Sequence, residues 1–205
     1  MKLSEHGFDI LKEQVHLFQD EKRFSHTLAV VKEAEYIALA CGMSEEYTEK
    51  AKIAALLHDI TKKFTDEEQR EMFVKYKIDI PSAPPTMHEK TGAYFARETF
   101  GKEIVDDEIF SAILCHTTAK ANMSMLDMII FIADFTEETR THKSCWDLRA
   151  YLHTECEKLN GEYEKAEALL RDVSLKIIAN TISFLALKKR TIDIRTIEAW
   201  NSIVS

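Results

Sequence analysis

The sequence predicts an all-α fold, and three observations support this prediction. Only five Gly and three Pro occur among 205 residues, so turn signals are few. Hydrophobic residues make up 45% of the chain, which is enough for a sizeable core. Apolar residues recur at spacings of three and four, as they do on the buried face of a helix. We therefore expect one domain over residues 1–205, with a helical core at about 20–140 and C-terminal helices at about 145–205.

Helices are expected wherever this spacing is bounded by capping residues. Ser25 and Ser44 are predicted N-caps, and Gly42 and Gly101 are predicted helix ends. The three prolines within residues 80–86 exclude a helix there and predict a loop. The tail is apolar enough to pack back onto the core. The expected helices span residues 3–20, about 25–41, 48–59, 66–76, about 88–100, 106–115, 125–135, 145–159 and 162–188, followed by the tail 192–204.

Charge and cysteine usage limit the partners and the compartment. The formal net charge of -8 argues against a nucleic-acid polymer as partner, because such a binder needs a basic face. No apolar run approaches the roughly 18 residues of a membrane span, so no membrane partner is expected. The start carries no secretory signal peptide and the cysteines form no CxxC pair. These features predict a cytoplasmic protein with reduced thiols at Cys41, Cys115, Cys145 and Cys156.

The stretch from Ala54 to Lys62 organises the expected site. It is typical of a buried helix that stops at the adjacent residues His58 and Asp59. An imidazole beside a carboxylate offers two metal ligands, and burying the pair without a partner would be costly. A helix-end histidine near an acidic residue is nevertheless the commoner interpretation of this dipeptide alone. Whether His58 and Asp59 form a metal site therefore depends on whether other residues of the chain supply further ligands.

Companion ligands come from other expected helices. His26 lies on an apolar helix face, His88 and His116 stand at helix ends, and Asp134 lies near the end of a strongly apolar helix. Taken alone, each of these residues is more often an ordinary core or helix-end residue than a metal ligand. Ligands that converge from separate helices are a known way to build metal sites in all-α proteins. Imidazole and carboxylate without thiolate favour iron, manganese, cobalt or zinc in a catalytic site.

Basic residues accompany the ligands in the sequence. Water on a divalent cation is acidic enough to serve as a nucleophile, and cations around it would neutralise a phosphoryl substrate. The competing interpretation is that these residues are surface charges in a chain that is 30% charged, and it stays open above all for Lys63 and Lys120. The basic residues near the ligands are Arg23, Lys62, Lys63, Lys120 and Arg140.

Three further features are assigned no site. His142 and His153 have no partner in the pattern and are expected to be exposed. The basic run Lys188–Arg190 is expected to be a solvated helix end.

The residues of these motifs resemble those of a known family. Lys62 stands in an HDxxK pattern, and the segments His116-Thr117-Thr118 and Ile132 to Arg140 are more specific than the HD pair. Together with Arg23–Thr27, they resemble the symmetrical bis(5'-nucleosyl)-tetraphosphatases, the YqeK branch of the HD phosphohydrolase superfamily. The match runs from about residue 10 to the C-terminus.

The resemblance implies an HD-domain helical bundle with a metal site in its core. It implies one or two divalent ions, iron before manganese, cobalt or zinc, and attack of metal-bound water that cleaves diadenosine tetraphosphate into two ADP. The principal metal ligands would be His26, His58, Asp59 and Asp134, with His88 and His116 completing a second position or contacting phosphate. The catalytic residues would be Asp59, Lys62, His88 and His116. Substrate binding would involve Arg23, His26, Lys62, His88, His116, Thr117, Thr118, Arg140, Thr196 and Asn201.

The chain departs from the family pattern at several positions. Ala119 stands where the family usually has Gly, Met87 where it has Trp, and Glu138 where it has Pro. Ile194-Arg195-Thr196 lacks the Pro that would precede the Thr. These departures remove no ligand, but they bear on nucleotide packing and hence on the preferred substrate.

Two alternatives stay open at this stage. One is another HD phosphohydrolase activity, on a mononucleotide or a cyclic nucleotide. The other is a nucleotide sensor without catalysis, although the intact ligands and Lys62 favour an enzyme. The native metal and its count, the preferred base and polyphosphate length, and the oligomeric state, a homodimer included, are left open.

Overall fold

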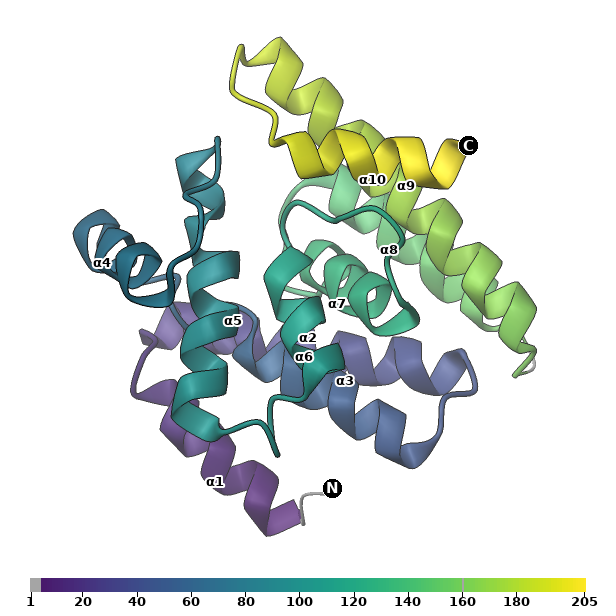
Figure 1. Ribbon diagram of the computed structural model, residues 1–205. Coiled ribbons are helices and arrows are strands. Elements are labelled where there is room, and N and C mark those ends of the chain that lie inside the picture. Colours follow the sequence, from purple (N-terminus) through teal and green to yellow (C-terminus); the bar gives the residue numbers. More distant parts are fainter. Residues whose placement is uncertain (1–4, 160) are drawn as a thin grey trace.

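The computed structural model describes residues 5–159 and 161–205, and these residues form helices connected by turns, without a strand (Figure 1). The predicted all-α fold is confirmed. No helix of the described residues is both long enough and apolar enough to cross a membrane. The elements in chain order are α1 (Glu5–His16), α2 (Glu21–Ala40), α3 (Glu45–Leu57), α4 (Asp66–Tyr76), the 3₁₀ turn η1 (Pro84–Thr86), α5 (Met87–Phe100), α6 (Asp107–Cys115), α7 (Met125–Thr136), α8 (Lys143–Cys156), α9 (Tyr163–Leu187) and α10 (Ile194–Val204).

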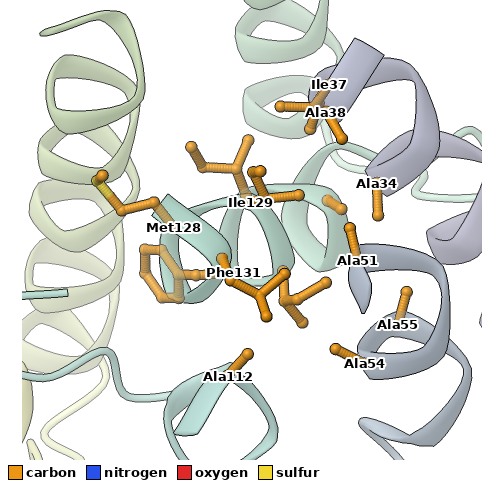
Figure 2. Close-up of a cluster of buried hydrophobic side chains, with 14 of the residues drawn as sticks. Ala34, Ile37, Ala38, Ala51, Ala54, Ala55, Ala112, Met128, Ile129 and Phe131 are labelled. Carbon is orange, nitrogen blue, oxygen red and sulfur yellow. The ribbon is translucent and has the colours of Figure 1, made fainter. Parts of the chain in front are cut away.

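Helix α7 is the centre of the core. It is mostly apolar and contacts α2, α3, α6, α8 and α9, as expected for a surrounded helix. Figure 2 shows alanines of α2 and α3 on one side of it, while the ring of Phe131 lies on the other side, next to Met128. Small side chains let helix axes approach closely, so α2, α3 and α6 pack tightly around α7. These alanines are Ala34, Ala38, Ala51, Ala54, Ala55 and Ala112, all fully buried.

The turn after α3 is held between two helices. The helix ends at Leu57, two residues before the predicted end, and His58 is its C-cap. Helix α5 packs directly on this turn, because a Cβ atom on Gly92 would lie only 3.4 Å from Thr61 Oγ1 and 3.5 Å from the His58 carbonyl oxygen. The Thr61 hydroxyl also donates to the His88 carbonyl over 3.1 Å. The turn thus has a fixed position relative to α5.

Several predicted boundaries are wrong, two of them for a clear physical reason. Asp20, not Ser25, is the N-cap of α2, since its carboxylate accepts a hydrogen bond from the Arg23 backbone N–H. Asp caps as well as Ser does, so the charged residues after it form the first helical turn. The loop at residues 80–86 contains the helical turn Pro84–Thr86, because proline is tolerated in the first turn of a helix.

The C-terminal helices cover α7 from one side. Helix α9 runs along α7 and α8, and α10 crosses over α9 near the C-terminus (Figure 1). All four cysteines are free and buried.

Replacing Ile129 by Ala should cost about 2–5 kcal/mol of unfolding free energy, because a fully buried side chain leaves a cavity in α7. Urea unfolding followed by circular dichroism measures this loss. The matched control is Leu39→Ala on α2, whose side chain is 59% exposed and should change stability by less than about 1 kcal/mol. Equal losses in the two variants would contradict this packing.

Candidate metal centre and active site

Six side chains from five helical segments meet in the core of the bundle. His26 lies in the second turn of α2, His58 and Asp59 follow α3, and His88 is the second residue of α5. His116 caps the C-terminus of α6, and Asp134 lies near the end of α7. Five of these residues are buried, and the Asp134 side chain is 18% exposed. The structure therefore brings together all six ligands that the sequence suggested.

Four ligand atoms surround one point. His26 Nε2 lies 3.1 Å from Asp134 Oδ1 and 3.8 Å from Asp59 Oδ2. His58 Nε2 lies 3.4 Å from Asp59 Oδ2 and 3.8 Å from Asp134 Oδ1. Two ligands that each lie about 2.1 Å from a common ion, at angles between 90 and 110 degrees, are about 3.0–3.5 Å apart. Two of the four distances lie in this range and two, at 3.8 Å, lie just above it, so the four atoms are close to the spacing of ligands on one cation.

A second set shares Asp59. Its other oxygen, Oδ1, lies 3.3 Å from His88 Nε2 and 3.5 Å from His116 Nε2. The two imidazole nitrogens are 3.2 Å apart. Asp59 thus presents one oxygen to each set, which is how a carboxylate bridges two metal ions.

Every histidine of the cluster is oriented through its Nδ1 atom. His58 Nδ1 is 2.6 Å from the Ala55 carbonyl oxygen, and His116 Nδ1 is 2.7 Å from that of Ile113. Such contacts select the tautomer that leaves Nε2 as the ligand. The remaining two contacts join His88 Nδ1 to the Pro85 carbonyl at 3.0 Å and His26 Nδ1 to Glu137 Oε1 at 3.0 Å.

Three buried polar atoms of the cluster without a hydrogen-bond partner show whether a cation fits there. His26 Nε2, His58 Nε2 and Asp59 Oδ1 are buried and have no hydrogen-bond partner among the described residues. An unsatisfied buried polar atom costs about 1–3 kcal/mol, and a divalent cation would satisfy all three. These donors are nitrogen and oxygen with no sulfur, as in catalytic rather than purely structural metal sites. The residues fit a divalent metal.

The pKa values of the four histidines shift in different directions. Burial opposes the charge of His116, but the Asp59 carboxylate raises its pKa. Burial lowers the pKa of His58, and burial with the nearby Lys62 lowers that of His88 well below its usual range. Both rings are therefore neutral and able to ligate. Burial opposes the charge of Asp134, but the Arg140 guanidinium beside it holds the pKa of this carboxyl well below its usual range. Burial also acts against protonated His26, yet the nearby carboxylates of Asp134 and Glu137 raise its pKa to about 9, so a cation bound there would displace a proton.

Three cations contact the cluster. Arg23 Nη1 donates to Asp59 Oδ2 over 2.7 Å. Arg140 Nη2 donates to Asp134 Oδ1, and its Nε donates to the Asp134 carbonyl over 2.7 Å. Lys62 Nζ lies 3.0 Å from His88 Nε2, and burial lowers its pKa. Of the other basic candidates, Lys63 pairs with Asp20 and Lys120 with Asp127, both away from the six ligands.

The loop after α6 contributes one hydroxyl to the cluster. Thr117 Oγ1 lies 3.1 Å from His88 Nε2. Thr118 is buried instead, and its hydroxyl donates to Glu89. The Thr196 hydroxyl donates to the Thr118 carbonyl over 2.9 Å, so it also acts within the protein. Asn201 is exposed on α10.

Glu89 and Glu137 are site residues that the sequence pattern left without a role. Buried Glu89 accepts the backbone N–H groups of Thr117 and Thr118, each over 3.1 Å, and binds the Arg195 guanidinium of α10. It thereby ties the loop after α6 to the C-terminal helix. Buried Glu137 orients His26 and accepts from Thr139. For Glu89, the sequence offers one indication of a role in the site: it follows His88 directly.

A cavity of about 930 Å³ opens beside the cluster. Lys62 and Thr117 line one part of it, and Thr118 and Thr196 contribute to its wall. Asn201 is not among its lining residues. The apolar part of the lining comprises Ala83, Pro84, Pro85, Phe135, Phe184 and Leu185.

One expectation about peripheral residues is wrong. The basic run Lys188–Arg190 is exposed at the end of α9, as expected, and Lys189 and Arg190 border this cavity. His153 is only partly exposed, and its Nε2 lies 3.0 Å from Oε1 of the buried Glu33. His142 is exposed as expected, and it borders the cavity.

Replacing Asp59 by Ala should abolish binding of the divalent cation while the helical fold is kept, because each set of ligand atoms loses its shared carboxylate. Metal content of the purified variant, measured by mass spectrometry beside its circular dichroism spectrum, checks this. The control is Asp147→Ala on α8, an exposed carboxylate that pairs only with Lys143. Full metal content in the Asp59 variant would contradict the assignment.

Replacing Glu89 by Gln should lower the unfolding free energy by about 1–3 kcal/mol, because the partly buried Arg195 loses the charge of its buried partner. Urea unfolding tests the loss. The same substitution at Glu98, which is exposed and pairs with Lys75, should change stability by less than about 0.5 kcal/mol. If both variants unfold alike, Glu89 does not stabilise the loop.

Comparisons with known proteins agree with this geometry. The chain is 30% identical over 188 residues to the symmetrical bis(5'-nucleosyl)-tetraphosphatase of Halalkalibacterium halodurans, covering 90% of each chain. It is 28% identical to the protein of the same name from Bacillus subtilis, over 90% of this chain and 91% of that one. A crystal structure from Clostridium acetobutylicum, described as a predicted HD superfamily hydrolase involved in NAD metabolism, superposes with a TM-score of 0.80 at 30% identity, covering 96% of both chains. A model of the HD domain family matches residues 23–138, and the chain belongs to this family of hydrolases.

Proposed function

We propose that this protein cleaves diadenosine tetraphosphate symmetrically into two ADP in a metal-dependent hydrolysis. The observation that carries the proposal is a buried His/Asp cluster in contact with Arg23, Lys62 and Arg140 and open to a large cavity. Two relatives that match about 90% of the chain carry the name of this activity.

The proposed ligands of the principal metal are His26, His58, Asp59 and Asp134. His88 and His116, with the second oxygen of Asp59, complete a second position or contact phosphate. A divalent cation, for which iron is the first expectation and manganese, cobalt and zinc are alternatives, supplies Lewis acidity and a water acidic enough to be the nucleophile.

The cationic side chains stabilise the charge that develops during hydrolysis. The water oxygen bonds to an inner phosphorus, the bond from that phosphorus to the central bridging oxygen breaks, and the second ADP leaves with this oxygen while a proton is released. Arg23, Lys62 and Arg140 stand where they neutralise non-bridging oxygens. ADP is a good leaving group, so little help from a general acid is needed.

The cavity suits the nucleoside of the retained ADP. Phe135, Phe184 and Leu185 offer an apolar wall for a base. Thr117 presents its hydroxyl beside His88, whereas we assign Thr118 and Thr196 to the shape of the wall because their hydroxyls already bind protein groups. Asn201 lies outside this lining, so a contact from it to the nucleotide stays a prediction. A cytoplasmic location and a homodimer likewise stay predictions.

Product analysis tests the function. The protein supplied with Fe(II) or Mn(II) should convert diadenosine tetraphosphate to ADP alone, and a chelator should stop the reaction. In isotopically labelled water, one of the two ADP molecules should carry the label in its terminal phosphate. Release of AMP and ATP would contradict symmetrical cleavage.

The same experiment separates the alternatives. Turnover of mononucleotides or cyclic nucleotides in place of the dinucleotide would indicate another HD phosphohydrolase activity. Binding of nucleotide without any product would indicate a sensor.

Lys62→Ala should lower kcat by about a hundredfold or more, because one stabilising cation is lost from the reacting phosphoryl group. Steady-state kinetics with diadenosine tetraphosphate measures this. The control is Lys165→Ala on α9, an exposed lysine that pairs with Glu162 and should retain full kcat. Unchanged kcat in the Lys62 variant would remove this residue from the reaction.

A further inference from the structure

The carboxylate of Glu89 binds the loop after α6 at several points. Glu89 lies in the first turn of α5, directly after His88, and is fully buried. Its Oε2 accepts the backbone N–H groups of Thr117 and Thr118, each over 3.1 Å, and its Oε1 accepts the Thr118 hydroxyl over 3.0 Å. The guanidinium of Arg195 on α10 also donates to Oε1. Both carboxylate oxygens are thus engaged inside the protein.

The start of α10 holds the same loop from the other side. Arg195 Nη1 donates to the carbonyl of Leu114 over 3.1 Å, just before the loop begins. The next residue, Thr196, donates its hydroxyl to the Thr118 carbonyl over 2.9 Å. The Arg195 side chain is only 19% exposed, so this attachment is largely shielded from water. The loop therefore lies between Glu89 of α5 and the first turn of α10.

The loop contains strained residues that need such support. Ala119 has a φ of 59° and Asn122 a φ of 54°, in the left-handed region where a Cβ atom is crowded. Residues 117–124 include no glycine that would relieve the strain. Strained backbone persists only where the surrounding structure holds it in place. The contacts of Glu89, Arg195 and Thr196 supply that restraint.

Thr117 is the loop residue whose position matters for the site. Its hydroxyl lies 3.1 Å from His88 Nε2, and its side chain lines the cavity beside the cluster. Its N–H is bound to Glu89, so the hydroxyl is the donor that Thr117 has left for a substrate. When His88 Nε2 ligates a cation it no longer accepts this hydrogen bond, and the hydroxyl can donate to a phosphate oxygen. A donor stabilises developing charge only at about 2.7–3.1 Å from the oxygen, so a small shift of the loop would weaken it.

We propose that Glu89 and Arg195 are positioning residues for the hydrolysis, because together they hold the Thr117 hydroxyl against a non-bridging oxygen of the phosphate under attack. This inference rests on the proposed function and extends it to the C-terminal helix. Arg195 contacts none of the six ligands among the described residues and does not line the cavity. Thr117 contacts the substrate, and Glu89 and Arg195 act through it.

A double-mutant cycle on the metal-loaded enzyme, with diadenosine tetraphosphate as substrate, tests this inference. Thr117→Val removes the hydroxyl at nearly constant volume and should lower kcat by about tenfold or more. Arg195→Met should lower kcat by about fivefold or more and change KM by less than about threefold. In the Thr117→Val background, Arg195→Met should lower kcat by less than about twofold further, because its effect passes through a hydroxyl that is already absent. An undiminished further loss would overturn the inference.

Three other variants complete the cycle. Arg171→Met on α9, an exposed arginine that pairs with Glu167, is the matched control and should retain full kcat. Arg195→Lys keeps a positive charge beside Glu89 and should lose less kcat than Arg195→Met. If Arg195→Met does not fold, Glu89→Gln takes its place in the cycle, since it leaves one acceptor oxygen where the loop and Arg195 use two.

Amide hydrogen exchange, measured by NMR without substrate, tests the loop itself. The Thr117 and Thr118 amides should exchange about tenfold or more faster in Arg195→Met than in the wild type, whereas the Ile129 amide in the core reports global unfolding. Unchanged protection of the two threonine amides would overturn the inference. If the wild-type enzyme releases no ADP from the dinucleotide, the proposed function fails and this inference fails with it. If it releases ADP and the cycle is additive, only the inference fails.

Discussion

The position of Asp59 is the constraint on which the site depends. Its carboxylate is buried, and its two oxygens face different pairs of histidines. A buried charge of this kind is tolerated only when cations or a metal surround it. The surrounding structure meets that condition: α3 ends just before Asp59, α5 packs against the turn at Gly92, and Arg23 reaches Asp59 from the first turn of α2.

Local sequence signals predict the fold and the ligands. They do not predict hydrogen bonds between residues that are far apart in the chain. Ser44 is the N-cap of α3 as predicted, although the helix begins at Glu45 and not at residue 48, and Asp106 caps α6. The cap of α2 was misplaced because Asp20 and Ser25 are equivalent as local signals, and only the structure shows which side chain accepts the N–H of Arg23. The bond from Glu137 to His26 joins residues 111 positions apart, and Glu89 binds Arg195 across 106 positions. Helical spacing relates residues three or four positions apart, so it predicts neither of these contacts.

The departures from the family pattern lie around the centre and leave its ligands in place. Ala119 has a φ of 59°, which supports the idea that this loop position favours Gly, and a left-handed Ala costs about 1–2 kcal/mol. Met87 is buried at the start of α5, and Glu138 pairs with Lys32 at the surface. These positions therefore affect the loop and the rim more than the chemistry.

The central claim is that the six His and Asp side chains hold a divalent cation. A crystal structure of the protein purified with iron, with anomalous data collected at the iron absorption edge, tests it most directly. The predicted result is an anomalous peak about 2.0–2.3 Å from His26 Nε2, His58 Nε2, Asp59 Oδ2 and Asp134 Oδ1. A second peak beside His88 and His116 would show that Asp59 bridges two ions. A map with no peak inside the cluster, or with its strongest peak at other residues, would contradict the claim.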